Sequence, residues 1–317
     1  MNELDTTWMN ELRERVAAEV GRVVIDSGEV VDVLLGALIL GGHVLLHGPP
    51  GVAKTLTASA FARAVGGDFR RVQFTPDMLP ADLIGTLAFR DGKPEFQPGP
   101  VFTNVLLADE INRTPPKTQA ALLEAMQEGQ TSVGGVSHPL PRPFLVTATQ
   151  SPLEFEGTYP LPPTQLDRFL MRIEIGYPSE EHELELLALP RAGLRDLALD
   201  DVGVVVADGE LEQAAQLVQA TTVSAEVAGY IVALVRQTRE LPSILLGASP
   251  RATVHLQAVA RVVARYAGRD FVTPDDVARA APYVLPHRLL LSPDAELGRY
   301  TTTDALTAAL ASVSVPR

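Results

Sequence analysis

The chain has 317 residues, a length that suggests two domains or one large one, and hydrophobic residues make up 46% of it, enough for a sizeable core. Its formal net charge of −13 disfavours non-specific binding to nucleic acid, because an acidic surface repels phosphate backbones. The chain has no cysteine, which excludes disulfides, thiolate catalysis and cysteine metal sites, and its six histidines show no metal-ligand spacing.

The N-terminal segment predicts a helix rather than an export signal. It is charged, and it places Leu12, Val16 and Val20 at helical spacing. The most apolar stretch, residues 33–46, is interrupted by Gly41-Gly42 and is too short to span a bilayer. We therefore expect a cytoplasmic protein without membrane insertion.

A glycine-rich loop lies between a predicted strand and a predicted helix. Residues 30–42 read as a helix that a glycine pair ends, residues 43–48 as a short buried strand, and residues 56–67 as a second helix. The segment HGPPGVAKT, residues 47–55, joins the strand to the second helix. This is the context that a phosphate-binding loop requires, although a plain glycine turn would also fit it.

The loop matches the P-loop pattern G-x-x-x-x-G-K-(S/T) except at one position. Gly48, Lys54 and Thr55 fit, whereas Ala53 replaces the second glycine. Alanine is tolerable there if its φ is negative, because glycine is required only for positive φ or a close backbone approach. Lys54 would reach the β- and γ-phosphates of ATP, and the Thr55 hydroxyl would bind Mg²⁺. The predicted nucleotide-binding residues are Gly48, Pro49, Pro50, Gly51, Val52, Ala53, Lys54, Thr55 and Leu56.

Strands and helices alternate after this loop, which indicates a parallel α/β sheet. Residues 104–113 and 143–152 predict buried strands, and residues 114–129 predict a helix between them. Turn signals at Asp91-Gly92 and Gly134-Gly135 predict hairpins at 85–99 and 131–141. Residues 181–209 are charged and irregular and predict a linker. We expect an αβα domain over 1–180 and an α-helical domain over 210–317.

Two adjacent acids end the strand that precedes the 114–129 helix. The run VLLADE, residues 105–110, is apolar until Asp109 and Glu110, and ionised carboxylates are costly to bury without a role. Adjacent strand residues point to opposite faces, so each acid addresses a different position. We assign Asp109 to Mg²⁺ and Glu110 to activation of the attacking water. A solvated strand end is the alternative.

Two arginines further along the chain are candidates for contacts with phosphate. Ser249-Pro250-Arg251 predicts a helix start with Ser249 as its cap, but an arginine is unfavourable at the positive end of a helix dipole. A γ-phosphate held there would remove the conflict, and a surface arginine is the alternative. Arg168 in the motif LDRF could act as an arginine finger, or it could form a salt bridge with Asp167 or Glu174.

Four motifs in this order resemble the MoxR family of AAA+ ATPases. They are GGHVLLHGPPGVAKT, LLADEINR, ATQSPLEFEGTYPLPPTQLDRF and GASPRA, and the resemblance extends from about residue 22 to the VPR tail. It implies an AAA+ αβα nucleotide-binding core with two hairpin insertions, a helical lid and a homo-oligomeric ring, usually a hexamer. It also implies that alanine before the P-loop lysine is compatible with a working loop.

The resemblance assigns roles by motif. Lys54 and Thr55 would form the Walker A site, and Asp109 and Glu110 the Walker B site. Arg168 would be the finger that reaches the neighbouring subunit, Arg251 would be sensor 2, and Ser151 would stand at sensor 1. Ser151 replaces an asparagine of the family, and serine has a shorter reach, which is compatible with slow hydrolysis. Residues 23–30 lack the glycine–glutamine pair that the family has near adenine.

The resemblance implies an ATP- and Mg²⁺-dependent, chaperone-like remodeller. Such proteins are associated with the maturation of client proteins or the insertion of their metal cofactors, often with a separate von Willebrand factor A domain protein. A nucleic-acid motor is a second hypothesis, which the net charge of −13 disfavours. A slow nucleotide-switched scaffold is a third, and it depends on Ser151.

Overall fold

The computed structural model describes residues 4–90, 93–150, 158–188 and 198–316. The chain packs as two compact units. The sheet unit contains Arg15–Leu161 and Ile173–Ala207, and the helical unit contains Met1–Glu14, Pro162–Arg172 and Asp208–Arg317. Packing units need not follow domain boundaries in sequence, so the boundaries at 180 and 210 stay a prediction. The segment 162–172, which contains LDRF, packs with the helical unit.

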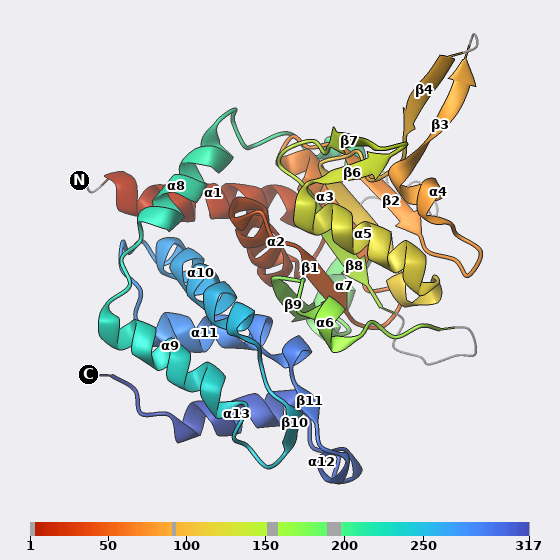
Figure 1. Ribbon diagram of the computed structural model, residues 1–317. Helices are drawn as coiled ribbons and strands as arrows, with labels where there is room; N and C mark the ends of the chain where they lie inside the picture. The colour runs from red at the N-terminus through yellow and green to blue at the C-terminus, as the bar shows by residue number, and fades with distance from the viewer. Residues whose placement is uncertain (1–3, 91–92, 151–157, 189–197, 317) are drawn as a thin grey trace. The chain divides into compact units, whose positions relative to one another are not determined.

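A five-stranded sheet forms the centre of the sheet unit, in the order β2-β5-β8-β1-β9 (Figure 1). The pairs β2–β5, β5–β8 and β8–β1 are parallel. The inner strands are buried along almost their whole length, as expected for a sheet covered on both faces. This confirms the predicted α/β class. The strands are β1 Val44–His47, β2 Phe69–Gln73, β5 Val105–Asp109, β8 Leu145–Thr149 and β9 Met171–Glu174.

The helices predicted at the N-terminus and over 30–42, 56–67 and 114–129 are formed, whereas two further helices, α4 and α7, lie in segments for which no helix was expected. The apolar helix α2 ends at Gly41, which takes the left-handed conformation at φ 64° that glycine adopts readily. Leu12, Val16 and Val20 of α1 are fully buried, which confirms the amphipathic pattern. Residues 180–188, expected to be irregular, form α7, because three glutamates in its first turn stabilise a helix start. The helices of this part are α1 Leu4–Gly21, α2 Gly28–Leu40, α3 Lys54–Ala64, α4 Pro80–Ile84, α5 Pro116–Glu128 and α7 Glu180–Ala188, with 3₁₀ turns at Ile111–Arg113 and Ala198–Asp201.

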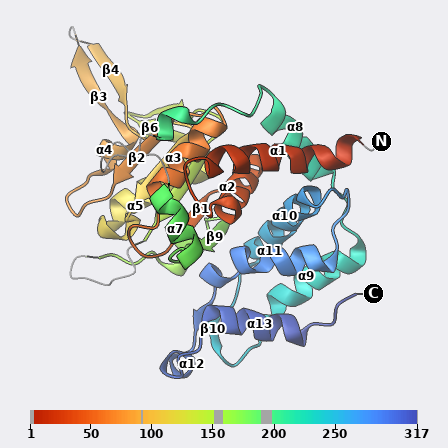
Figure 2. The same cartoon turned by 180° about the vertical axis from the view of Figure 1, so that it is seen from behind.

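Both predicted hairpins are formed. β3 Gly85–Arg90 pairs antiparallel with β4 Lys93–Pro98, although the turn residues Asp91 and Gly92 lie outside the described residues. β6 Gln130–Val133 pairs with β7 Val136–Pro139 through Gly134 and Gly135, which both have the positive φ that a tight hairpin turn requires. The β3–β4 hairpin extends away from the central sheet (Figures 1 and 2). Its Phe96 ring stacks on His138 of the second hairpin, with ring centroids 3.7 Å apart.

The helical unit is built around α10, which packs against α8, α9 and α11, while α13 packs against α9 and α11 (Figure 2). Its elements are α6 Pro163–Leu166, α8 Glu210–Ala220, α9 Ala225–Gln237, β10 Ile244–Leu246, α10 Pro250–Tyr266, α11 Pro274–Val284, a 3₁₀ turn Pro286–Arg288, β11 Leu290–Leu291, α12 Pro293–Leu297 and α13 Thr302–Ser312. Asp276 closes a capping box with Thr273 at the start of α11 and forms an ion pair with Arg269. In the part of the chain that the structure describes, no helix is long and apolar enough to cross a membrane.

Candidate nucleotide-binding site

The loop between β1 and α3 approaches the backbone that follows β9. The Ile175 amide donates a hydrogen bond of 2.7 Å to the His47 carbonyl oxygen. A Cβ atom on Gly48 would clash with the carbonyl oxygen of Ile175, so only glycine fits at this first loop position. The glycine of the motif is therefore required by a close backbone approach.

Ala53 does not have the negative φ that would make alanine easy to accommodate. It lies in the left-handed region, at φ 57° and ψ 18°, directly before the first residue of α3. A side chain in this region costs about 1–2 kcal/mol relative to right-handed geometry, because Cβ approaches the following carbonyl oxygen. The backbone at this position keeps the conformation suited to glycine, although the residue is alanine.

The two acids lie at the carboxyl end of β5, beside the loop. The Asp109 carboxylate accepts a 2.6 Å hydrogen bond from the Thr149 hydroxyl, at the end of the adjacent strand β8. Glu110 has left-handed geometry at φ 57°, and its amide donates to the same Thr149 oxygen over 2.8 Å. Glu110 thus lies just beyond the end of the strand, so the strand alternation expected for the two acids does not apply to it. Thr149 was not expected as a site residue from the sequence.

Side chains from β2 and from the turn after β5 also hold the acids. Arg71 contacts the second Asp109 oxygen through Nη2 at 2.6 Å and Nε at 3.1 Å. The Gln73 amide donates to Glu110 Oε2 at 2.7 Å, and Arg113 donates to the same oxygen at 2.8 Å. Each acid is thus held by at least one donor from another element.

One cavity of about 580 Å³ brings the predicted phosphate and metal residues together. Lys54 Nζ donates to the carbonyl oxygens of Gly48 and Pro49 at 2.8 Å, so its ammonium lies over the loop. Burial lowers the Lys54 pKa, and the charges of Asp109 and Glu110 oppose that shift. The lining residues are Gly48, Pro50, Gly51, Ala53, Lys54, Thr55, Leu56, Arg71, Gln73, Asp109, Glu110, Thr149 and Gln150.

A second cavity, of about 210 Å³, shares loop residues Gly51, Ala53 and Leu56 with the first. Its wall includes residues 23–27, in the segment that lacks the glycine–glutamine pair, and residues 173–178, which follow β9. The side chains that line it are largely aliphatic, among them Val23, Ile25 and Leu56. This arrangement offers an apolar slot next to the phosphate loop. No feature of the sequence pointed to residues 173–178 as part of a site.

The residues of the cavity fit a magnesium ion held jointly with a nucleotide. Within the described ranges, no three His, Cys, Asp or Glu side chains gather closely enough to hold a metal by themselves. Mg²⁺ at nucleotide sites commonly takes one or two protein oxygens and completes its shell with phosphate and water. Thr55 and Asp109 line the same cavity and provide such oxygens.

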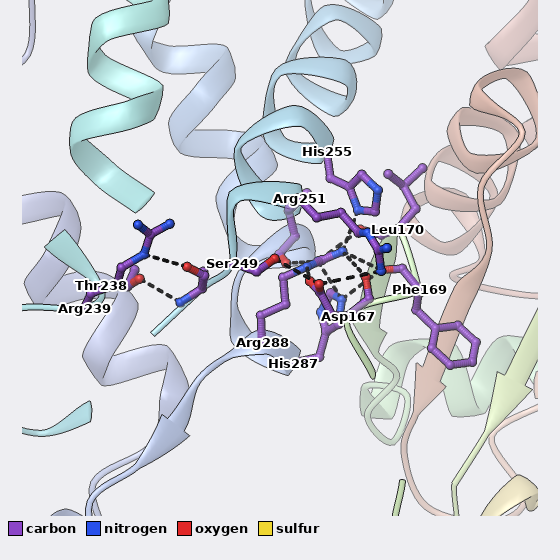
Figure 3. Close-up of polar contacts among 12 residues, drawn as sticks. Asp167, Phe169, Leu170, Thr238, Arg239, Ser249, Arg251, His255, His287 and Arg288 are labelled. Atoms are coloured by element: carbon purple, nitrogen blue, oxygen red, sulfur yellow. Dashed lines mark hydrogen bonds and ion pairs between the residues drawn. The ribbon is translucent and has the colours of Figure 1, made fainter. Parts of the chain in front are cut away.

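The two candidate arginines outside this cavity, Arg168 and Arg251, lie in the helical unit. Arg251 is in the first turn of α10, and its Nη1 is 3.7 Å from the Asp167 carboxylate (Figure 3). The anion beside this helix start is therefore a side chain of the same unit. Ser249 occupies the cap position without making a capping bond, and its hydroxyl donates to Asp167 at 2.9 Å.

Arg168 forms neither of the salt bridges considered for it. Across the ranges that the structure describes, no ion pair joins its side chain to Asp167 or Glu174. Asp167 is instead bound by Arg288, whose Nε is 2.8 Å from Oδ1. Ser151, the sensor 1 candidate, lies outside the described residues.

Comparison with known proteins agrees with this geometry. Residues 43–171 match the family described as "ATPase family associated with various cellular activities (AAA)", and residues 236–309 match the one described as "AAA lid domain". The fold and the site together define an AAA+ ATPase, with an α/β core and a helical lid.

Similar full-length proteins narrow the class further. The chain is 44% identical to "Chaperone MoxR1" of Mycobacterium tuberculosis, over 96% of this chain and 82% of that protein. It is 34% identical to "Protein MoxR" of Methylorubrum extorquens, over 98% and 97% of the two chains. A crystal structure from Cytophaga hutchinsonii superposes with a TM-score of 0.91 at 39% identity, covering 99% of this chain and 98% of the other. This chain belongs to the MoxR family of AAA+ ATPases.

Proposed function

We propose that the protein is a cytoplasmic, Mg²⁺-dependent, chaperone-like ATPase that works as a homo-oligomeric ring, expected to be a hexamer. The observation that supports this most strongly is the single cavity that Lys54, Thr55, Asp109 and Glu110 line together. A chance match to the P-loop pattern would not place two acids from another strand beside the lysine.

Four residues of the cavity would have distinct roles in ATP hydrolysis. Lys54 would exchange its loop carbonyls for the β- and γ-phosphate oxygens of ATP. Thr55 and Asp109 would hold Mg²⁺, which neutralises the charge that develops on the transferred phosphoryl group. Glu110, oriented by Gln73 and Arg113, would accept the proton of the attacking water. The aliphatic slot beside the loop would take the adenine ring.

The proposal extends to the lid and to partners. Arg168 would complete the site of a neighbouring subunit, and Arg251 would act as sensor 2. Ser151 would act at sensor 1. The name of the M. tuberculosis relative supports a chaperone-like role. We further propose that a protein client is matured or receives a metal cofactor, with the help of a separate von Willebrand factor A domain protein.

The experiment that tests the ATPase proposal is Lys54→Ala. Removing the only loop ammonium should abolish binding of a fluorescent ATP analogue in the presence of Mg²⁺. Lys117→Ala is the matched control, because Lys117 is exposed at the start of α5 and lies outside the cavity. Unchanged nucleotide affinity in Lys54→Ala would remove the P-loop assignment. Turnover that rises on addition of single-stranded DNA would favour a nucleic-acid motor instead.

A further inference from the structure

Arg288 is a buried arginine that the nucleotide site does not include. It ends the 3₁₀ turn after α11, and its side chain is 1% exposed. Its guanidinium donates to the Asp167 carboxylate at 2.8 Å and to the Phe169 carbonyl oxygen at 2.6 Å, with longer contacts of 3.4 Å to the carbonyls of Asp167 and Leu170 (Figure 3). One side chain thus contacts the backbone on both sides of Arg168.

The same guanidinium makes three further contacts, so some of its N–H groups are shared. Nη2 is 2.6 Å from His255 Nδ1, and Nη1 contacts the Val284 carbonyl oxygen and lies 2.7 Å from His287 Nε2. Burial is the main cause that lowers the His255 pKa to about 4, and the positive charge of Arg288 is the second. This ring is therefore neutral and can accept the bond. Burial lowers the Arg288 pKa to about 10, against the effect of Asp167, so Arg288 stays charged at neutral pH.

A buried ion pair is a poor way to gain stability alone. Desolvation offsets most of the attraction, and apolar residues of similar volume often stabilise a core as well or better. What such a pair offers is a fixed geometry, because a guanidinium presents its donors in a rigid planar fork. Here the fork fixes residues 167, 169 and 170.

The residue between these fixed points has a different environment. Arg168 is partly exposed, and within the described ranges no hydrogen bond or ion pair of its side chain is formed. The backbone at Arg168 is therefore held firmly while its guanidinium stays free to bind elsewhere. An arginine that must meet a phosphate on another molecule requires this combination, since precision there depends on the supporting contacts.

We propose that Arg288 is a positioning residue for Arg168, and that it acts by fixing the backbone of the LDRF turn through Asp167 and the adjacent carbonyls. The inference rests on the proposed role of Arg168 as a finger that acts across a subunit boundary. Arg288 then serves the ATP site of the neighbouring subunit, although it touches no nucleotide.

Two other roles for Arg288 lead to different results. Asp167 also binds Ser249 and lies near Arg251, so Arg288 could act on the nucleotide site of its own subunit through the start of α10. Alternatively, Arg288 could only stabilise the helical unit. Mixed rings distinguish these cases, because each ATP site takes its pocket from one subunit and its finger from the next.

The test uses Arg288→Lys, which keeps the charge but loses the fork. Homogeneous rings should bind ATP normally and turn over about 10²-fold more slowly, the size expected from a small misplacement of a catalytic group. Mixed with inactive Glu110→Gln subunits, Arg288→Lys should recover activity, because its intact pocket meets an intact finger. Mixed with Arg168→Ala subunits, it should recover none, since every finger is then defective.

The opposite results would overturn the proposal. Recovery with Arg168→Ala but not with Glu110→Gln would place the defect in the pocket of the same subunit. If neither mixture recovers activity, although native mass spectrometry shows that the rings are mixed, the role of Arg288 is purely structural. If Arg168→Ala rings turn over at the normal rate, the finger assignment itself fails, and this is visible without any Arg288 variant.

Arg269→Lys is the matched control for stability. Arg269 forms a bidentate pair with the buried Asp276 in the same unit, at 2.6 and 2.5 Å, and it has no place in the proposed site. It should lower the melting temperature without slowing turnover per assembled ring. If Arg288→Lys does not fold, Asp167→Asn replaces it in the same two mixtures, because it weakens the same anchor while keeping the shape of the side chain.

Discussion

Asp109 in the sheet unit and Asp167 in the helical unit bind similar groups. Each carboxylate accepts hydrogen bonds from one hydroxyl and one guanidinium, on separate oxygens, and Asp167 also has Arg251 at 3.7 Å. Thr149 and Arg71 bind Asp109, both with shortest distances of 2.6 Å, whereas Ser249 and Arg288 bind Asp167 at 2.9 and 2.8 Å. The two acids are also similarly covered, with side chains 14% and 18% exposed.

The two sites differ in how exposed their arginine side chains are. The Arg71 side chain is 48% exposed, and that of Arg288 is 1% exposed. An exposed ion pair contributes little and exchanges easily with other partners, whereas a buried charge that loses its partner is strongly destabilising. The same chemistry therefore makes a replaceable contact at Asp109 and a permanent one at Asp167. A metal ligand requires the first kind of contact, and a structural anchor requires the second.

The largest expected effect tests whether Asp109 and Glu110 take part in ATP hydrolysis. Glu110→Gln should keep ATP binding and lower turnover by about 10²–10⁴-fold, because it removes the group that accepts the proton of water. ATPase rates and nucleotide affinity at saturating Mg²⁺ measure this. Glu124→Gln, on the exposed side of α5, is the control. If Glu110→Gln blocked binding while Asp109→Asn were silent, the roles of the two acids would have to be exchanged.

The next largest effect is on the free energy of unfolding, which is compared between variants of Arg288 and Arg71. Arg288→Met should lower the free energy of unfolding by about 3–5 kcal/mol, because Asp167 loses its buried partner. Arg71→Met should lower it by less than about 1 kcal/mol, since water can replace an exposed guanidinium. Urea unfolding of both variants, with the wild-type slope as reference, gives the two values. Equal losses would show that exposure does not separate the two sites.

The smallest expected effect is a shift in the Mg²⁺ concentration at which nucleotide binding is half-maximal. If Arg71 competes with the ion for Asp109, then Arg71→Gln should lower the Mg²⁺ concentration for half-maximal binding of a fluorescent ATP analogue. A shift of about two- to fivefold is expected, because an exposed pair is worth no more than about 1 kcal/mol. Arg70→Gln removes the same charge from the adjacent exposed position and should leave the midpoint unchanged. A higher midpoint in Arg71→Gln would mean that Arg71 supports the ion.

The site residues that belong to a local sequence pattern could be predicted from the sequence. Lys54 and Thr55 follow a recognisable loop, and Asp109 and Glu110 end a buried strand, so all four could be placed at one edge of a parallel sheet. Thr149 and Arg71 could not, because their contacts with Asp109 join residues 40 and 38 positions apart and depend on strand order. Arg288 lies 121 positions from Asp167, and nothing in the residues around it indicates such a partner.

Two expectations failed for identifiable physical reasons. The charged stretch after residue 179 was expected to be irregular, but the acids Glu180, Glu181 and Glu183 favour the start of α7. For Ala53, negative φ was the condition under which alanine would be easy to accommodate, and that is the usual geometry of a residue with a Cβ atom. The loop imposes the left-handed region instead, so tertiary structure overrides the local preference.

The left-handed geometry of Ala53 also bears on the loop when no phosphate is present. Glycine populates both signs of φ about equally, but alanine gains roughly 1–2 kcal/mol by leaving this region. When no nucleotide is bound, loop conformations other than the described one are therefore more populated than they would be with glycine. A nucleotide that requires the described shape must first select it, and apparent affinity falls in proportion to the population that is ready to bind. Alanine at this position thus provides a way to weaken nucleotide binding without altering any group that touches the nucleotide.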